Sequence, residues 1–134
     1  MADNIFQKRV LIVDGSVWAQ SMLRETLRQL GFKNILEAED GERALSMISA
    51  GSIDLVFTDL NMPALSGIEL IQKIRQNAAS KYLPVIVVSG ESDQDVVIQA
   101  LRAGANAFVV KPFSSKTIKE RIIQVLSKVP RPTP

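Results

Sequence analysis

The sequence predicts an α/β fold: a doubly wound, five-stranded parallel sheet with helices on both faces. Five apolar, strand-like segments alternate with five segments of helical periodicity. The segments at 10–13, 55–57 and 85–88 are continuous runs of Val, Ile, Leu and Phe, which is typical of strands buried on both faces. The alternation by itself does not give the order of the strands.

Length and composition narrow the function classes. A chain of 134 residues indicates one domain, and 46% hydrophobic with 22% charged residues is typical of a globular protein. The chain has no cysteine and no histidine, which excludes a disulfide framework, thiolate or histidine zinc sites, and Ser-His or Cys-His catalysis. The net charge of +2 does not favour nucleic acid, and no apolar run could span a bilayer. We therefore expect a cytoplasmic protein that binds neither nucleic acid nor membrane.

The first part of the chain is predicted to hold two strands and two helices. In order these are a short arm at 1–7, a strand at 8–14, a helix at 16–30, a strand at 35–38 and, after an Asp-Gly turn at 40–41, a helix that ends at Gly51. Gly31 is a natural stop for the first helix. Trp18 lies on this helix, and we expect it to be partly buried there.

The remainder is predicted to hold three strands, each followed by a helix. In order these are the central strand at 55–59, a helix from Ser66, a loop at 76–82, a strand at 85–88, a helix at 93–103, a strand at 107–110 and a helix from Ser114. Ser66 and Glu69 have the spacing of a capping box. The domain is expected at 1–129, with the Pro-rich segment 130–134 as a tail or the start of a linker.

Reactive or polar side chains end four of the five predicted strands: Asp14, Asp59, Ser89 and Lys111. The carboxyl ends of parallel strands lie at one edge of the sheet, where open α/β sheets bind their ligands. Taken alone, Asp59 is better explained as a carboxylate that only terminates the strand or caps a turn, because Asp at a strand end is common turn chemistry. Four such residues at one edge predict a shallow functional site.

These residue types favour phosphoryl chemistry. Two carboxylates and nearby backbone carbonyls suit Mg²⁺, and a carboxylate can attack phosphorus to give an aspartyl phosphate. Lys111 and Mg²⁺ would neutralise charge, while Ser89 would donate a hydrogen bond to a phosphoryl oxygen. No general base is needed, which is consistent with a chain without histidine.

Five short motifs carry a family resemblance: Leu-Ile-Val-Asp at 11–14, Asp-Leu-Asn-Met-Pro at 59–63, Ser-Gly at 66–67, Val-Ser-Gly at 88–90 and Lys-Pro-Phe at 111–113. With them the chain, from about residue 9 to 126, resembles the receiver domains of two-component response regulators, of the single-domain chemotaxis type. The resemblance implies a flavodoxin-like fold with strand order 2-1-3-4-5.

The resemblance also implies a role for each site residue. Asp59 would accept a phosphoryl group from a histidine kinase or histidine phosphotransfer protein in a phosphorelay. Asp14, Asp59 and the backbone carbonyl of Asn61 would hold Mg²⁺. Phosphoryl binding and switching would fall to Ser89, Lys111 and Phe108, and the Lys111–Pro112 bond would be cis.

Signalling, rather than catalysis on an external substrate, is the implied activity. Phosphotransfer and autodephosphorylation would occur only at the protein's own aspartate, and the added charge would shift a two-state equilibrium. A downstream protein would bind the face formed by 93–126, that is, the helix at 93–103, the last strand and the last helix.

Gly15 departs from the family pattern, in which two adjacent acidic residues follow the first strand. The loss of one carboxylate predicts weakly bound Mg²⁺, and Glu39 is expected in a solvated loop and not as a substitute. Phosphorylation survives if water fills the vacancy; the alternative is a pseudo-receiver that binds partners without phosphorylation. An aspartyl phosphatase would need a second Asp where this chain has Asn61, and no dinucleotide-binding Gly-x-Gly-x-x-Gly follows the first strand.

Overall fold

The computed structural model describes residues 4–128, so the predicted tail at 130–134 and the first residues of the predicted arm lie outside it. Its strands are β1 (Arg9–Val13), β2 (Asn34–Ala38), β3 (Leu55–Thr58), β4 (Val85–Ser89) and β5 (Ala107–Val110). Its helices are the 3₁₀ turn η1 (Ile5–Gln7) and α1 (Val17–Leu30), α2 (Gly41–Ser49), α3 (Gly67–Gln76), α4 (Gln94–Ala103) and α5 (Ser115–Lys128). Within the described residues, no helix combines the length and the apolar character needed to cross a membrane.

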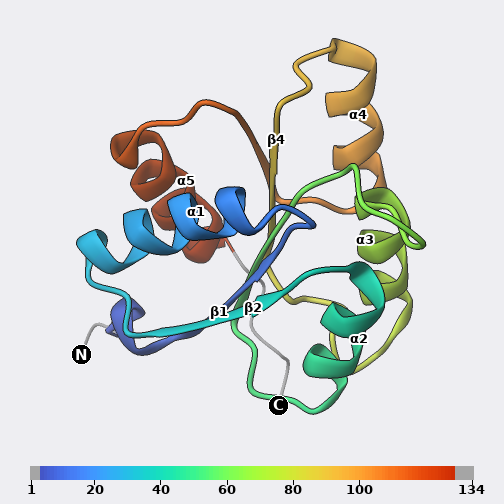
Figure 1. The fold of residues 1–134 in the computed structure, drawn as a ribbon. Coiled ribbons are helices and arrows are strands. Elements are labelled where there is room, and N and C mark those ends of the chain that lie inside the picture. The colour runs from blue at the N-terminus through green and yellow to red at the C-terminus, as the bar shows by residue number, and fades with distance from the viewer. Residues whose placement is uncertain (1–3, 129–134) are drawn as a thin grey trace.

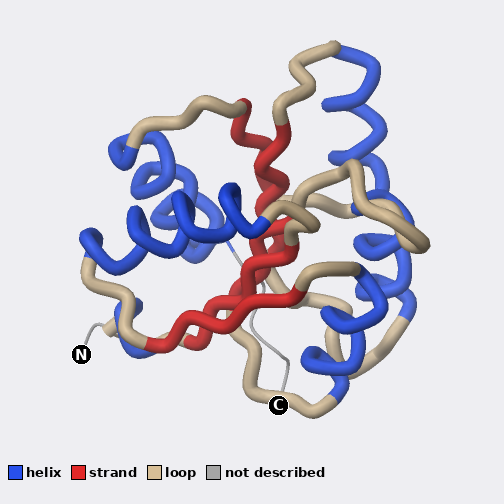
Figure 2. Tube along the Cα trace, in the orientation of Figure 1, coloured by secondary structure: helices blue, strands red, loops and turns tan. Residues whose placement is uncertain are grey.

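The five strands form one sheet in the order β2-β1-β3-β4-β5, and every neighbouring pair is parallel. The predicted fold class and strand order are confirmed (Figures 1 and 2). The pairing of Val13 with both Ala38 and Thr58 aligns the ends of β1, β2 and β3. Polar residues that follow these strands are therefore placed side by side.

Alternate residues of β1 face opposite layers of the core, because successive side chains of a strand point to opposite faces. Val10 and Ile12 pack with the inward residues of α1 and α5, whereas Leu11 and Val13 pack with those of α2, α3 and α4. All four side chains are at most 1% exposed. Figure 1 shows the two layers: α1 and α5 cover one face of the sheet, and α2, α3 and α4 cover the other.

Local capping fixes the helix ends that the sequence predicted. The Ser66 hydroxyl accepts a hydrogen bond from the Glu69 amide while the Glu69 carboxylate accepts one from the Ser66 amide, which completes the capping box. Ser16 caps α1, and Gly31 ends it with a left-handed φ of 115°. The Ser114 hydroxyl accepts a hydrogen bond from the Thr117 amide at the start of α5.

The 3₁₀ turn η1 was not predicted, because three residues are too short to show a helical period. Asn4 caps it by accepting a hydrogen bond from the Phe6 amide at 3.0 Å. Phe6 then packs edge-on against Phe32, with 5.2 Å between the ring centroids. This segment lies at the amino-terminal end of β1, and the predicted site lies at the opposite end of the strands.

Candidate functional site

Backbone hydrogen bonds extend the sheet by one residue at the edge where the predicted site lies. The Asp59 amide donates to the Val13 carbonyl at 3.0 Å, and the Asp14 amide donates to the Ala38 carbonyl at 3.1 Å. The Lys111 amide donates to the Ser89 carbonyl at 2.8 Å. These bonds fix the backbone of both aspartates and of Lys111 before their side chains interact.

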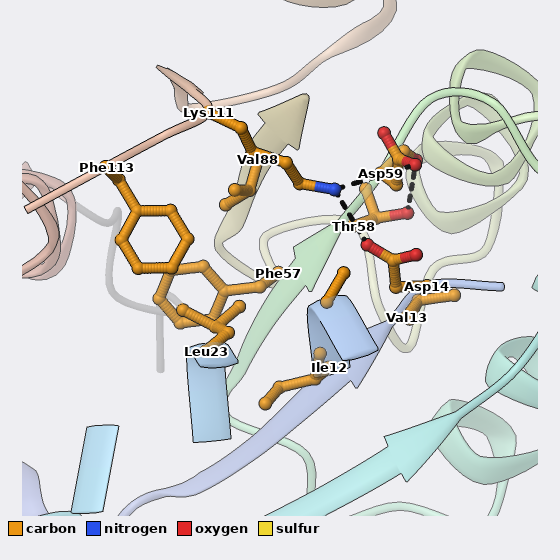
Figure 3. A pocket seen from close by; sticks show the side chains of 11 residues that line it. Ile12, Val13, Asp14, Leu23, Phe57, Thr58, Asp59, Val88, Lys111 and Phe113 are labelled. Atoms are coloured by element: carbon orange, nitrogen blue, oxygen red, sulfur yellow. Dashed lines mark hydrogen bonds and ion pairs between the residues drawn. The ribbon is translucent and has the colours of Figure 1, made fainter. Parts of the chain in front are cut away.

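Lys111 links the two aspartates (Figure 3). Its Nζ lies 3.0 Å from Asp14 Oδ2 and 3.9 Å from Asp59 Oδ2. The side chains of Asp14, Asp59 and Lys111 are 9%, 15% and 29% exposed, so all three are largely shielded from water. Two carboxylates and one ammonium leave one uncompensated negative charge when all are ionised, which makes the pocket attractive to a cation.

Asp59 uses its two carboxylate oxygens differently. Oδ1 accepts a hydrogen bond from the Leu60 amide at 2.8 Å, whereas Oδ2 makes the longer contact with Lys111 at 3.9 Å. Burial raises the pKa of Asp59 above its usual range. The Leu60 amide, Lys111 and the Asn61 amide oppose this effect in part, and nearby Asp14 adds to it. Oδ1 is therefore tied to the backbone of the next residue, while Oδ2 is the oxygen that faces Lys111.

Ser89 lies at the same edge, fully buried, with its hydroxyl turned to its own loop. The hydroxyl accepts a hydrogen bond from the Glu91 amide at 3.1 Å. The Glu91 carboxylate in turn accepts a hydrogen bond from the Asn61 side chain at 2.8 Å. These contacts join the loops after β3 and β4, and a contact of Ser89 with a phosphoryl group stays a prediction.

Phe108 lies on β5 and is partly buried against the core layer that contains α4. It also lines an open hollow of about 480 Å³ between α4, β5 and α5, together with Val97, Leu101, Asn106, Ala107, Arg121, Gln124 and Val125. The Lys111–Pro112 peptide bond that follows β5 is cis, as the resemblance implied.

Gly15 leaves room beside Asp14. A Cβ atom at this position would lie 3.7 Å from both the Glu39 carbonyl oxygen and Pro63 Cδ, which is ordinary contact distance. Within residues 4–128, no group of three or more Asp, Glu, His or Cys side chains is placed to hold a metal ion. The groups that could bind a cation are therefore Asp14, Asp59 and backbone oxygens. They form a hard oxygen set that fits Mg²⁺ but supplies few negative charges.

Two residues of α1 were not predicted correctly: the exposure of Trp18 was wrong, and Gln20 was not predicted as part of the site. Trp18 is 77% exposed, so the prediction of partial burial was wrong: the inward stripe of α1 runs through Leu23 and Leu27 and leaves Trp18 on the outer side. Gln20 is only 8% exposed, and its side-chain amide donates a hydrogen bond to the Asp14 carbonyl. Its place one turn before Leu23 on the inward stripe was the available signal.

A comparison of the sequence with known protein families agrees with the motifs and with the geometry of the pocket. The model of the response regulator receiver domain matches residues 10–123. The chain belongs to the response regulator receiver family. The receiver is 40% identical to the chemotaxis protein CheY of Pseudomonas aeruginosa over 121 residues, which covers 90% of this chain and 98% of that protein. It is 39% identical to the chemotaxis protein CheY-3 of Vibrio cholerae, covering 90% and 93%.

Solved structures resemble this receiver throughout. A putative response regulator from Chloroflexus aurantiacus has a TM-score of 0.86 and 30% identity, with 91% of this chain and 99% of that chain covered. The complex of CheX, CheY, BeF₃ and Mg²⁺ from Borrelia burgdorferi gives 0.82 and 32%, with 89% of each chain covered. TM-scores above 0.8 show that these neighbours share the fold of this receiver.

Proposed function

We propose that this receiver accepts a phosphoryl group on Asp59 from a histidine kinase or a histidine phosphotransfer protein, and so switches a partner-binding surface. The observation that carries the proposal is the pairing of Lys111 with both Asp14 and Asp59 at the carboxyl edge of the sheet. Asp59 Oδ2 would attack phosphorus, the bond from phosphorus to the donor imidazole would break, and the imidazole would leave. The proposal includes a cytoplasmic location. It also includes chemistry that is confined to the protein's own aspartate, without an external substrate.

The pocket residues would share the charge of the phosphoryl group. Asp14, Asp59 and the Asn61 carbonyl would hold Mg²⁺, which when bound supplies positive charge to the phosphoryl oxygens. The binding would be weak, because Gly15 contributes no carboxylate. Lys111, now 3.0 Å from Asp14, would turn its ammonium group toward the phosphoryl oxygens. Ser89 would exchange its bond with the Glu91 amide for a bond that it donates to the same group.

The output would be read on the face of α4, β5 and α5. The hollow beside Phe108 opens between these elements, and Ser89 pairs with Val110 at the end of β5. A rearrangement of Ser89 therefore reaches the strand that carries Phe108. We propose that a downstream protein binds this face and distinguishes the two states.

A phosphate mimic tests the proposal directly. Beryllofluoride with Mg²⁺ should shift the amide resonances of Ser89, Phe108 and Lys111, and an Asp59→Asn variant should remove the effect. Unchanged resonances at a saturating mimic concentration would refute it. Binding that persists unchanged in Asp59→Asn would place the mimic elsewhere and refute it equally.

A pseudo-receiver is the second candidate, and Gly15 is the observation that favours it. Here partner binding would depend on the same face but not on phosphorylation. A pull-down with a partner of the α4–β5–α5 face should then be unaffected by Asp59→Ala. The first proposal instead predicts that a phosphodonor changes partner affinity in wild type and not in this variant.

A further inference from the structure

Gln20 is a buried polar side chain of α1 that points at the backbone of the cation pocket. It is only 8% exposed, and its side-chain nitrogen lies 2.5 Å from the Asp14 carbonyl oxygen and 3.3 Å from that of Ala38. Both partners are acceptors, so the amide NH₂ group must be the donor to both. One side chain of α1 thus ties the ends of β1 and β2 together.

Asp14 is held from three further sides. Its amide donates to the same Ala38 carbonyl at 3.1 Å. Its Oδ1 accepts a hydrogen bond from the Ser16 amide at 2.9 Å, and its Oδ2 pairs with Lys111 at 3.0 Å. The Asp14 carbonyl, however, belongs to the peptide unit shared with Gly15, and Gln20 is the side chain that fixes its direction.

Gly15 makes this restraint important. It is exposed, and its missing Cβ would have met only two atoms, both at ordinary contact distance, so no packing orders this residue. A glycine without packing has more backbone freedom than any other residue. Without Gln20, the peptide unit between Asp14 and Gly15 would lose the side chain that fixes its direction. The Asp14 carboxylate would then be held only by the Ser16 amide and Lys111.

We propose that Gln20 is a positioning residue for the cation pocket: its amide fixes the turn at Asp14 and Gly15 and so sets the affinity for Mg²⁺. The inference rests on the proposed function, since it assumes that Asp14 and Asp59 hold that ion. Side chains that orient metal ligands from behind typically contribute about 10- to 100-fold to metal affinity. Gln20 would act in this way through the backbone of a ligand.

The test replaces Gln20 by Met, which keeps the length of the side chain and removes the donor. Mg²⁺ affinity, followed by NMR through the Gly15 and Ser16 amides, should fall at least about tenfold. Without metal, hydrogen exchange of the Ser16 amide should become faster, because its bond to Asp14 Oδ1 loses support. Ser80→Ala is the matched control: Ser80 is also 8% exposed and donates to the Ile74 carbonyl, at the opposite edge of the sheet.

A rescue separates positioning from general loss of stability. Gly15→Ala adds no ligand and restricts the turn, so it should recover part of the Mg²⁺ affinity in the Gln20→Met background. Unchanged Mg²⁺ affinity in Gln20→Met, an equal loss in Ser80→Ala, or no recovery in the double variant would each overturn the proposal. If wild type binds no Mg²⁺, the metal part of the proposed function fails, and unchanged Ser16 exchange in Gln20→Met would still overturn the role of Gln20.

Discussion

Replacing Gly15 by Asp should change both the stability of the receiver and its affinity for Mg²⁺, in opposite directions. The position accepts a side chain, since a Cβ atom would lie 3.7 Å from its nearest neighbours, the Glu39 carbonyl oxygen and Pro63 Cδ. Without metal, the new carboxylate would repel the pocket carboxylates. Two unit charges about 4 Å apart interact by about 1 kcal/mol in water, so we expect a free energy of unfolding lower by about that amount.

Bound Mg²⁺ should reverse the effect of Gly15→Asp on the stability of the receiver. The same carboxylate attracts a doubly charged ion, and twice the interaction of unit charges gives about 2 kcal/mol, or roughly thirtyfold tighter binding. Repulsion from Asp14 is present before and after binding, so it does not enter this difference. A bound ion stabilises the folded state by an amount that grows with the logarithm of the ratio of its concentration to its Kd. At high Mg²⁺, Gly15→Asp should therefore unfold at a higher temperature than wild type.

The assay is a Mg²⁺ titration followed by amide NMR, together with thermal unfolding at several Mg²⁺ concentrations. Gly15→Asn is the matched control, because it has the shape of Asp without the charge. Gly15→Ala controls for the added Cβ alone. If Gly15→Asp binds Mg²⁺ no more tightly than Gly15→Asn, the pocket is not the cation site and the reasoning fails.

Three further predictions concern stability and exposure. Asp59→Asn should raise the melting temperature at neutral pH, because burial raises the pKa of Asp59 and its charged form therefore opposes folding. This advantage should shrink as pH falls through the raised pKa and vanish below 3.8, the ordinary value; an advantage that grows toward low pH would contradict it. Arg75→Met should lower the free energy of unfolding by roughly 2–3 kcal/mol, since its guanidinium donates to the Leu83 and Gly104 carbonyls and to the Asn106 side chain. In urea unfolding the exposed Arg102→Met serves as its control, and equal effects would argue against the Arg75 contacts. Trp18, the single tryptophan, should emit as a solvated indole and be readily quenched by acrylamide, because it is 77% exposed; blue-shifted emission would contradict this placement.

The fold was predictable because its signals are local and repeated. Apolar runs such as Val85–Val88 are strands buried on both faces, and the Ser66–Glu69 spacing marks the start of α3. The order of the strands does not follow from such patterns, because any order keeps the same alternation. It came from the family resemblance, and the pairing of β1 with β2 and β3 confirms it.

For the candidate site, the clustering of the side chains was predictable from the sequence, and their individual contacts were less so. Parallel strands bring Asp14, Asp59 and Lys111 to one edge whatever their side chains do. That Lys111 lies nearer to Asp14 than to Asp59 depends on rotamers, which the sequence does not specify. Gln20 escaped prediction because a glutamine in an apolar stripe has no fixed partner until two strand ends are placed beside it.

Chemical trapping at Asp59 tests the central claim most directly. After incubation with acetyl phosphate and Mg²⁺, borohydride reduction converts an aspartyl phosphate to homoserine, and peptide mass spectrometry locates it. The account predicts homoserine at position 59 in wild type, with none elsewhere and none in the Asp59→Asn variant. An unmodified Asp59, under conditions that label another receiver in the same tube, would contradict the claim that this carboxylate accepts a phosphoryl group.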